Sequence, residues 1–429
     1  MSIILDAVYL LVVIGTSPWW MRKQRGGWRE RFGRIEPLPA KRRKRIVVHA
    51  VSVGEVNLTR PFVEALRRSC EIVVTTTTDT GMARARSIYS DMPDVWVRRY
   101  PLDASWSVRR FLDAAAPDGV VLVELELWPN FLRACERREI PVCVVNGRLS
   151  ERSFARYRRV RWLFQRWFGR LAFAATQDEA YAERFRAMGA KDVRVGGNMK
   201  WDSAHVVEGD ARDLPGAAAL AREMGIDRDM PLIVGGSTAP EEHALLIDAT
   251  PNGVQLLCAP RRPEWFDDAA AALEGCVRRS ATKTGSTGGG SSTGRFLLDT
   301  IGELRNAYAL ADVVVIGRSF GALYGSDPME AAGLGKPVII GPRVSDFASV
   351  VETMEQAGAI IRTTPERLRD DVARLLGDEG ERRALGEQAR ACVKANQGAA
   401  ARQAAMVLSM IGMDESARLN AVEAASVTA

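Results

Sequence analysis

The stretch RIVVHAVSVGEVNLTRPFVEALRR, residues 45–68, contains in order a short apolar run, a turn and a helix-like segment. A short apolar run bounded by turn residues is typical of a buried strand. The turn Ser52-Val53-Gly54-Glu55 fits a capping box, in which the serine caps a helix and the glutamate three residues later reaches back. The stretch therefore predicts a strand–turn–helix unit, and it leaves open whether Glu55 is a helix cap or a catalytic base.

The same alternation of short apolar runs and longer helical segments continues along the 429 residues. It predicts two α/β domains, each a doubly wound parallel sheet, joined by a polar linker at 199–215. Ligands of such sheets bind beyond the carboxyl ends of the strands, so we expect a cleft between the two domains. The predicted strands are 45–51, 71–77, 95–101, 119–125, 141–147, 171–177 and 192–198, then 231–237, 254–261, 295–299, 312–319 and 336–342.

Cysteine and histidine usage argues against metal and disulfide sites. The six cysteines form no CxxC pair, and the chain has only three histidines. This pattern favours reduced thiols over a zinc site or a disulfide framework. No GxxxxGK[ST] motif is present, which excludes a P-loop nucleotide-binding protein. We expect no metal and no cofactor.

Positive charge is concentrated near the N-terminus. Residues 1–45 contain eleven Lys and Arg against three acids, a net charge of +8 in a chain of net charge +6. Residues 3–20 are mostly apolar, interrupted by Asp6, and Trp19 and Trp20 precede the basic run. This order favours a helix that spans or lies on a membrane, with its basic flank on anionic lipid at the cytoplasmic face. It does not fit a signal peptide, which begins with a positive region.

A second basic stretch, 151–170, interleaves seven Arg with aromatic residues. Such a pattern is typical of a nucleic-acid or membrane surface, or of an exposed helix whose Arg stems cover apolar neighbours. Because the N-terminal segment also favours a membrane, we predict that residues 151–170 face a membrane surface, and we expect no nucleic-acid partner.

Polar residues follow several predicted strands, where parallel strands present their carboxyl ends. Helix capping or solvation explains most of them equally well, but Glu124 ends an apolar strand and needs a partner or a function. The Gly-containing turns 235–242 and 317–325 present backbone N–H groups that suit a phosphate. The residues after the strands are Glu55, Glu124, Lys200, Ser237, Thr238, Pro260, Arg261 and the run Asp327-Pro328-Met329-Glu330.

A set of motifs in fixed order resembles the 3-deoxy-D-manno-octulosonic acid (Kdo) transferases that add Kdo to lipid A. The resemblance covers nearly the whole chain, and the ordered set is far more specific than any one motif. The motifs are HAVSVGEV (49–56), TTTTDTG (75–81), ELELWPN (124–130), NGRLSERS (146–153), GNMKWD (197–202), GGST (235–238), APRRPEWF (259–266), DTIGELRNAYALAD (299–312) and DPMEAAGLGKPVIIGP (327–342).

The resemblance implies a GT-B fold of two Rossmann-like domains, with the acceptor on the first and CMP-Kdo on the second. It implies a membrane-associated segment at 1–40, an acceptor domain at 41–200 and a CMP-sugar domain at 216–415. The acceptor is a lipid A precursor of the lipid IVA type at the cytoplasmic face of the inner membrane, and attack opposite the departing CMP inverts the anomeric carbon.

The resemblance also implies roles for individual residues. Glu55 is the general base, and Glu124 and Lys200 stabilise the transition state. The pocket for CMP comprises Pro260, Arg261, Ile301, Gly302, Glu303, Asp327, Pro328, Met329 and Glu330. We also expect Ser52, Gly54, Ser237 and Thr238 to bind substrate.

Two positions depart from the family pattern. Arg262 stands where the family often has histidine, and Asp327 stands where it often has asparagine. An ionised aspartate cannot donate a hydrogen bond, so the donor contacts can differ. Two alternatives therefore stay open, namely another GT-B glycosyltransferase that uses a different nucleotide sugar, and a non-enzymatic scaffold that binds lipid or nucleic acid.

Overall fold

A computed structural model describes residues 6, 26–283 and 293–413. The chain folds into two units. The first comprises residues up to Ser203 together with the segment that begins at Gln397, and the second runs from Ala204 to Asn396. The predicted N-terminal segment 3–20, apart from Asp6, and most of the Gly/Ser-rich stretch 282–294 lie outside the described residues.

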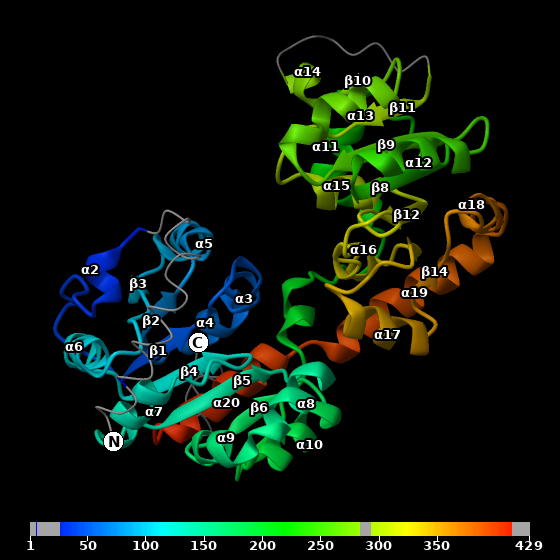
Figure 1. Ribbon diagram of the computed structural model, residues 1–429. Coiled ribbons are helices and arrows are strands. Elements are labelled where there is room, and N and C mark those ends of the chain that lie inside the picture. The colour runs from blue at the N-terminus through cyan, green and yellow to red at the C-terminus, as the bar shows by residue number, and fades with distance from the viewer. Residues whose placement is uncertain (1–5, 7–25, 284–292, 414–429) are drawn as a thin grey trace, which may run out of the picture. The chain divides into compact units, whose positions relative to one another are not determined.

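The first unit contains a seven-stranded parallel sheet of order β3-β2-β1-β4-β5-β6-β7 (Figure 1). The chain starts at β1, winds to one edge, and then returns past β1 to the other edge. β1 and β4 are therefore neighbours at the point where the winding reverses, which is where such sheets bind ligands. The strands are β1 Arg45–His49, β2 Glu71–Thr76, β3 Val95–Arg99, β4 Gly119–Val123, β5 Val142–Gly147, β6 Ala174–Thr176 and β7 Val193–Val195.

Helices cover the strands because the central strands are apolar on both faces. Every residue of β1 and β4 is buried, as parallel sheets require. The first unit contains α2 Trp28–Arg31, α3 Val53–Leu58, α4 Arg60–Leu66, α5 Asp79–Tyr89, α6 Ser105–Ala115, α7 Pro129–Glu136, α8 Glu151–Arg159, α9 Arg161–Phe168, α10 Glu179–Met188, the 3₁₀ turn η1 Met199–Ser203, and α20 Ala399–Met410.

The second unit repeats this architecture with a parallel sheet of order β10-β11-β9-β8-β12-β13-β14. Its winding reverses between β8 and β12. The strands are β8 Leu232–Thr238, β9 Gln255–Pro260, β10 Val277–Arg278, β11 Arg295–Leu297, β12 Val313–Ile316, β13 Val338–Ile340 and β14 Ile361–Arg362. The helices are η2 Ala211–Asp213, α11 Pro215–Met224, η3 Pro240–Glu242, α12 His243–Ala249, η4 Pro263–Trp265, α13 Phe266–Ala272, α14 Arg279–Lys283, α15 Leu304–Leu310, α16 Met329–Gly333, α17 Ala348–Gln356, α18 Leu368–Gly377 and α19 Glu379–Asn396.

The predicted α/β class with two Rossmann-like units is confirmed, and every strand expected from the sequence is present. β10 and β14 were not predicted. Each has only two residues and lies at the end of the second sheet, so neither leaves an apolar run long enough to recognise.

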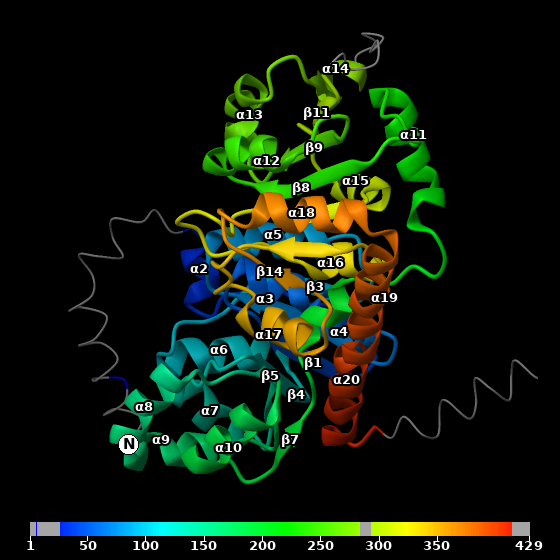
Figure 2. The ribbon, with the colours of Figure 1, turned by 90° about the vertical axis from the view of Figure 1, so that its right-hand side faces the viewer.

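The last described helix, α20, belongs to the first unit. Its residues Ala400, Ala404 and Val407 are buried in one core with strands β1, β2, β4 and β5, and the helix packs beside α4 (Figure 2). The predicted second domain, 216–415, therefore extends past the observed end of the second unit at Asn396. The difference arises because the apolar face of α20 completes the first core.

Asp6 is the one described residue of the apolar N-terminal run. Its carboxylate accepts hydrogen bonds from the N–H of Ser105 (2.9 Å) and from the side-chain amide of Asn130 (3.1 Å). It thereby supplies the first turn of α6 with the acceptor that the N-cap residue Ala104 lacks. Within the described residues, no helix is long and apolar enough to cross a membrane.

Candidate active site

The turn after β1 holds Glu55 by three hydrogen bonds. Ser52 caps α3 by accepting the N–H of Glu55 (3.3 Å), and its hydroxyl donates to one carboxylate oxygen of Glu55 (2.9 Å). The other carboxylate oxygen accepts the N–H of Val51 (2.8 Å). The capping interpretation is therefore correct for the geometry, with Val51 supplying the donor. One acceptor site on each carboxylate oxygen is thus engaged, and a proton from a bound molecule would go to a remaining site.

Gly54 leaves space at this turn. A Cβ atom added there would meet only the Ser52 hydroxyl, at 3.8 Å, which is an ordinary contact. The backbone conformation does not demand glycine either, since its φ is not positive. Packing within the first unit therefore does not explain the missing side chain, and the exposed position leaves room for a ligand.

Three carboxylates gather where the first sheet reverses its winding. Glu55 follows β1, and Glu124 and Glu126 follow the neighbouring strand β4. Burial raises the pKa of Glu55, and the charge of Glu124 adds to the effect. Burial, helped by the charges of Glu55 and Glu124, raises the pKa of Glu126 to about 7. The cluster therefore takes up and releases a proton near neutral pH.

The backbone at Glu124 is unusual. Its φ is 62°, in the left-handed region that a non-glycine residue rarely adopts. Its N–H nevertheless continues the ladder of the sheet by donating to the carbonyl of Val145 (2.9 Å). Such conformations persist where the surroundings enforce them, often at functional sites. Because the backbone of Glu124 is not extended, the side chains of Glu124 and Glu126 do not continue the alternation of a regular strand.

Glu126 is the residue of this cluster that sequence reasoning missed. Its carboxylate accepts the indole N–H of Trp128 (3.0 Å). The signal was present in the ELELWPN motif, which contains two glutamates, but only the first was assigned a role. Nothing in the spacing distinguishes the two, because the pKa of Glu126 depends on burial and on Glu55, which lies far away in sequence.

Lys200 lies on η1, which contacts α3, the helix that carries Glu55. Asn146, at the end of β5, fixes η1 by accepting the N–H of Met199 (3.0 Å). Asn146 has a φ of 51°, and its buried side-chain nitrogen has no hydrogen-bond partner among the residues that the structure describes. The structure thus brings the backbone of Lys200 to the helix of Glu55 and adds Asn146, which the sequence did not suggest.

In the second unit, a group of polar residues surrounds Tyr308. This tyrosine is fully buried on α15, and its hydroxyl interacts with the side chain of Ser237 at the end of β8. A Cβ atom at Gly236 would lie 2.0 Å from the tyrosine hydroxyl, so this position must be glycine. Asp327, Glu330 and Arg261 all act on Tyr308 electrostatically. The structure therefore brings together these four predicted donor residues, including Ser237.

Glu330 and Asp327 form the acidic side of this group. Burial raises the pKa of Glu330 and the charge of Asp327 raises it further, while Arg305 and Arg261 oppose the shift. Asp327 accepts the N–H of Met329 (2.8 Å) at the start of α16, and Pro328 is the N-cap residue. Helix capping therefore accounts for one contact of the Asp327 side chain.

Thr238, Pro260 and the neighbouring arginines complete the same edge of the second sheet. Pro260 is the last residue of β9, and the carbonyl of Thr238 accepts the N–H of Arg261 (3.0 Å). Arg261 is exposed. Arg262 turns away from this group, since it pairs with Glu264 (3.7 Å) and covers the ring of Trp265.

Glu303 has partners within its own unit. Its carboxylate pairs with Arg279 (2.9 Å) and Lys283 (2.8 Å) and accepts the hydroxyl of Thr300 (2.5 Å). Burial alone would raise its pKa, but these contacts hold the pKa of Glu303 at about 2. Ile301 is largely exposed, and Gly302 has a φ of 94° with open space around it. A ligand at this turn would meet the backbone of residues 301 and 302 rather than the carboxylate.

The glycine turns suggested as phosphate cradles are occupied by the protein itself. The buried carboxylate of Glu242 accepts the N–H groups of Arg318 (2.7 Å), Ser319 (2.8 Å) and Phe320 (3.0 Å). It also accepts the N–H of Ala239 (2.8 Å). These donors already bind an internal anion, so they are not available to a phosphate. The expectation is wrong for these four N–H groups, because their partner is a distant glutamate.

Within the described part of the chain, no group of three or more His, Cys, Asp or Glu side chains has the arrangement needed to hold a metal ion. The chemistry that these residues offer is proton transfer at the first sheet and anion binding at the second.

Comparison with known proteins relates each unit to a family. Residues 26–203 match the model of the 3-deoxy-D-manno-octulosonic-acid transferases, and residues 295–391 match the model of the glycosyl transferases group 1. A 3-deoxy-D-manno-octulosonic acid transferase of Bordetella pertussis is 35% identical over 92% of this chain and 97% of its own length. One of Haemophilus influenzae is 28% identical over 82% of this chain and 84% of its own length.

Solved structures agree on the fold. A glycosyltransferase from Rickettsia africae superposes with a TM-score of 0.57 at 12% identity, covering 86% of this chain and 99% of its own. Anabaena HepE in complex with UDP gives a TM-score of 0.55 at 15% identity, covering 85% of this chain and 99% of its own. At these identities the likeness shows the GT-B architecture alone.

Proposed function

Because this chain belongs to the 3-deoxy-D-manno-octulosonic acid transferase family, we propose that it moves Kdo from CMP-Kdo to a lipid A precursor of the lipid IVA type. The family resemblance of the sequence motifs is confirmed, and the chain is a glycosyltransferase. The observation that carries the finer proposal is the group of three carboxylates after β1 and β4, which supplies a proton acceptor.

The reaction needs such an acceptor because a sugar hydroxyl is a poor nucleophile. The acceptor oxygen bonds to the anomeric carbon of Kdo as its proton passes to Glu55. The bond from that carbon to the phosphate oxygen breaks, and CMP leaves with the electron pair. Attack opposite the leaving group inverts the anomeric carbon. The raised pKa of Glu55 strengthens it as a base, because a weaker acid has a more basic conjugate carboxylate.

The leaving phosphate needs positive charge, which the second unit supplies. Arg261 is exposed at the end of β9 and lies near Glu330 and Tyr308. A guanidinium there offsets the charge that develops on CMP. We also propose that Glu124 and Lys200 stabilise the transition state. We propose further that the donor pocket includes Ser237, Thr238, Pro260, the 301–303 turn and residues 327–330.

We further propose that the enzyme acts at the cytoplasmic face of the inner membrane, on an anionic surface. Exposed aromatic rings of the first unit support this. Trp28, Phe32 and Trp106 stack in a row, with centroids 5.9 Å and 5.5 Å apart, and each is more than a third exposed. Ser105, which binds Asp6 of the apolar N-terminal run, is adjacent in sequence to Trp106. On α9, Trp162 is 78% exposed among arginines.

Incubation of the full-length protein with CMP-Kdo and a tetraacylated lipid A precursor tests donor and acceptor together. We expect the mass of the acceptor to increase by whole Kdo units, and the number of units gives the number of transfers. An unchanged acceptor would contradict the proposal. In that case, thermal stabilisation by UDP or GDP and not by CMP would favour a different nucleotide sugar, which is the alternative that Arg262 and Asp327 leave open.

A further inference from the structure

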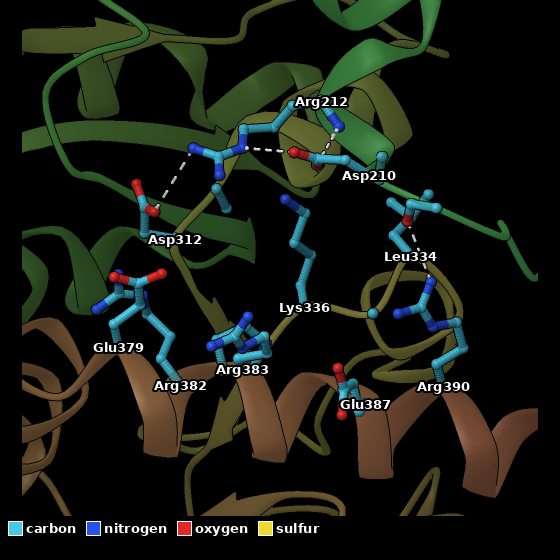
Figure 3. A pocket seen from close by; sticks show the side chains of 15 residues that line it. Asp210, Arg212, Asp312, Leu334, Lys336, Glu379, Arg382, Arg383, Glu387 and Arg390 are labelled. Carbon is cyan, nitrogen blue, oxygen red and sulfur yellow. Dashed lines mark hydrogen bonds and ion pairs between the residues drawn. The ribbon is translucent and has the colours of Figure 1, made fainter.

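A cavity of about 300 Å³ lies in the second unit, away from the proposed donor residues (Figure 3). Asp312, on its wall, precedes β12, and Lys336 precedes β13. The cavity is therefore at the amino ends of the strands. Ser237 and Arg261 stand at the carboxyl ends of β8 and β9, which is the opposite edge of the same parallel sheet. The cavity and the donor site are separate.

Lys336 is the unusual member of this cavity. The residue is only 7% exposed, and its side chain points into the cavity (Figure 3). Among the residues that the structure describes, its ammonium makes neither a hydrogen bond nor an ion pair. Burial lowers the pKa of Lys336 to about 8, so the group still carries its proton at neutral pH. Asp210 and Asp312 attract the ammonium without touching it, so its hydrogen-bond donors at the cavity wall are open to the oxygens of a ligand.

The nearby carboxylates are engaged with other groups. Asp210 accepts the N–H of Arg212 (2.9 Å) and pairs with its guanidinium (3.3 Å). Asp312 lies 4.0 Å from the same guanidinium. Arg390 donates hydrogen bonds to the carbonyls of Val207 (2.9 Å) and Gly209 (3.1 Å), so these partners are neutral and not carboxylates. Around Lys336, three cations thus face two carboxylates.

The rim of the cavity does not cancel this excess. Arg382 and Arg383 are balanced by Glu379 and Glu387, all of which lie on α19. The whole lining therefore carries one positive charge more than its acids neutralise. An ammonium beside guanidinium groups is the donor set that proteins use for phosphate oxygens.

We propose that this cavity binds a compact phosphate-type oxyanion, held by Lys336 together with Arg212 and Arg390. The ligand is either free phosphate or the phosphoryl group of a small phosphate monoester. The proposal does not depend on the proposed transfer reaction, because it uses the opposite edge of the sheet.

The position of the cavity gives such a ligand a structural effect. Arg212 lies in the segment at the start of the second unit, which begins at Ala204. Arg390 lies on α19, the helix that ends the second unit at Asn396. These two segments already contact each other through Glu208 and Lys394 (2.7 Å). An anion that joins Arg212, Lys336 and Arg390 adds a second link between them and stabilises the second unit.

Calorimetric titration of the full-length protein with inorganic phosphate, at constant ionic strength and with excess CMP, tests the proposal. CMP keeps phosphate out of the proposed donor site. We expect Lys336→Met to weaken phosphate binding by about tenfold or more, as loss of a charged hydrogen-bond partner does. Lys394→Met is the matched control, since this exposed lysine pairs with Glu208 outside the cavity, and its affinity should stay within about twofold.

Two further measurements separate the possible outcomes. Titration with glycerol 3-phosphate distinguishes the sources, since tighter binding than inorganic phosphate indicates a monoester and weaker binding indicates the free anion. Arg261→Met alters the proposed donor site and should leave phosphate binding at the cavity unchanged. An error in the donor-site assignment would therefore not be mistaken for an absence of binding at the cavity.

Equal phosphate affinity in the wild-type protein and Lys336→Met would overturn the proposal, as would no binding to the wild type. In chloride, Lys336→Met should unfold at the same or a higher temperature, because a buried charge is removed. A markedly lower temperature would show that Lys336 serves the fold itself, and that also overturns the proposal.

Discussion

The carboxyl edges of the two sheets share an architecture but differ in the cations that lie beside their acidic residues. In the first unit, Glu55 and Glu126 have raised pKa values, and within the described residues no ion pair involves either of them. In the second unit, Glu303 pairs with Arg279 and Lys283, and its pKa falls to about 2. The first edge leaves these two acids without a cation partner, whereas the second edge pairs Glu303 with two cations. Glu330, also at the second edge, keeps a raised pKa.

The difference follows from where the cations are. Arg261 and Arg305 act on Glu330 in the second unit, whereas the carboxylates of the first unit meet mainly backbone N–H groups, a hydroxyl and an indole. A base must be free to accept a proton, and a leaving phosphate needs cations. In the proposed mechanism, the first unit therefore supplies the base and the second unit supplies the cation for the leaving phosphate.

The largest effect is expected for Glu55→Gln. The glutamine side chain can still accept the N–H of Val51, so the turn should fold, but it cannot take the acceptor proton. We expect the transfer rate to fall by about a hundredfold to ten-thousandfold, the usual contribution of a general base. Radiolabelled transfer from CMP-Kdo measures the rate, and circular dichroism checks the fold. A folded variant with near-normal turnover would remove Glu55 from the mechanism.

A smaller loss is expected when the cation of the second edge is removed. Arg261→Met should slow transfer by about a hundredfold, since a group that stabilises the leaving phosphate is lost. Arg262→Met is the matched control, because Arg262 is adjacent but pairs with Glu264 and covers Trp265. We expect the control to keep its rate within about twofold. Equal losses in the two variants, measured by the same assay, would contradict the assignment.

For stability we expect the opposite order, with a larger loss from a substitution in the second unit than from Glu55→Gln in the first. The two carboxylate oxygens of Glu242 accept hydrogen bonds from four backbone N–H groups. Glu242→Gln keeps only one of these oxygens and replaces the other with an NH₂ group, which faces N–H donors. We expect the free energy of unfolding to drop by about 3 kcal/mol. Glu55→Gln should lose about 1 kcal/mol or less, since only a helix cap is altered. Urea denaturation measures both, and a larger loss in Glu55→Gln would reverse the comparison.

The smallest effect is expected at Gly54. Alanine there meets only the Ser52 hydroxyl at 3.8 Å, so stability should change by less than about 0.5 kcal/mol. If an acceptor approaches this turn, the added methyl group should raise the KM for the lipid acceptor several-fold and leave the KM for CMP-Kdo unchanged. Steady-state kinetics with each substrate varied in turn checks this, and an unchanged acceptor KM would place the acceptor elsewhere.

Most of the fold followed from the sequence because buried parallel strands appear as continuous apolar runs. The order of polar residues after those runs also indicated the edge at which the candidate site is proposed. The return of α20 to the first unit was not predictable, since an Ala-rich amphipathic helix fits many apolar surfaces. Its destination is set by complementarity with β1, β4 and α4, which only the tertiary structure shows.

The site was predicted less completely than the fold. Glu55 and Arg261 could be chosen from motifs, but the pKa of Glu126 depends on Glu55 and Glu124 across two strands. The capture of the 318–320 N–H groups by Glu242 joins residues more than seventy positions apart. A local pattern contains no information on either contact, so the sequence suggested a phosphate cradle where an internal anion is bound.

The most direct test of the central claim is the dependence of the transfer rate on pH in the wild type and in Glu126→Gln. The pKa values of Glu55 and Glu126 are raised, so the wild-type rate should be high above about pH 7 and fall as pH decreases and the cluster takes up a proton. Glu126→Gln removes the group whose pKa is about 7, and with it the proton that the cluster takes up near neutral pH, so the fall should move to lower pH. A rate that does not change between about pH 5 and 8, or a fall at the same pH in both proteins, would contradict proton transfer at this cluster.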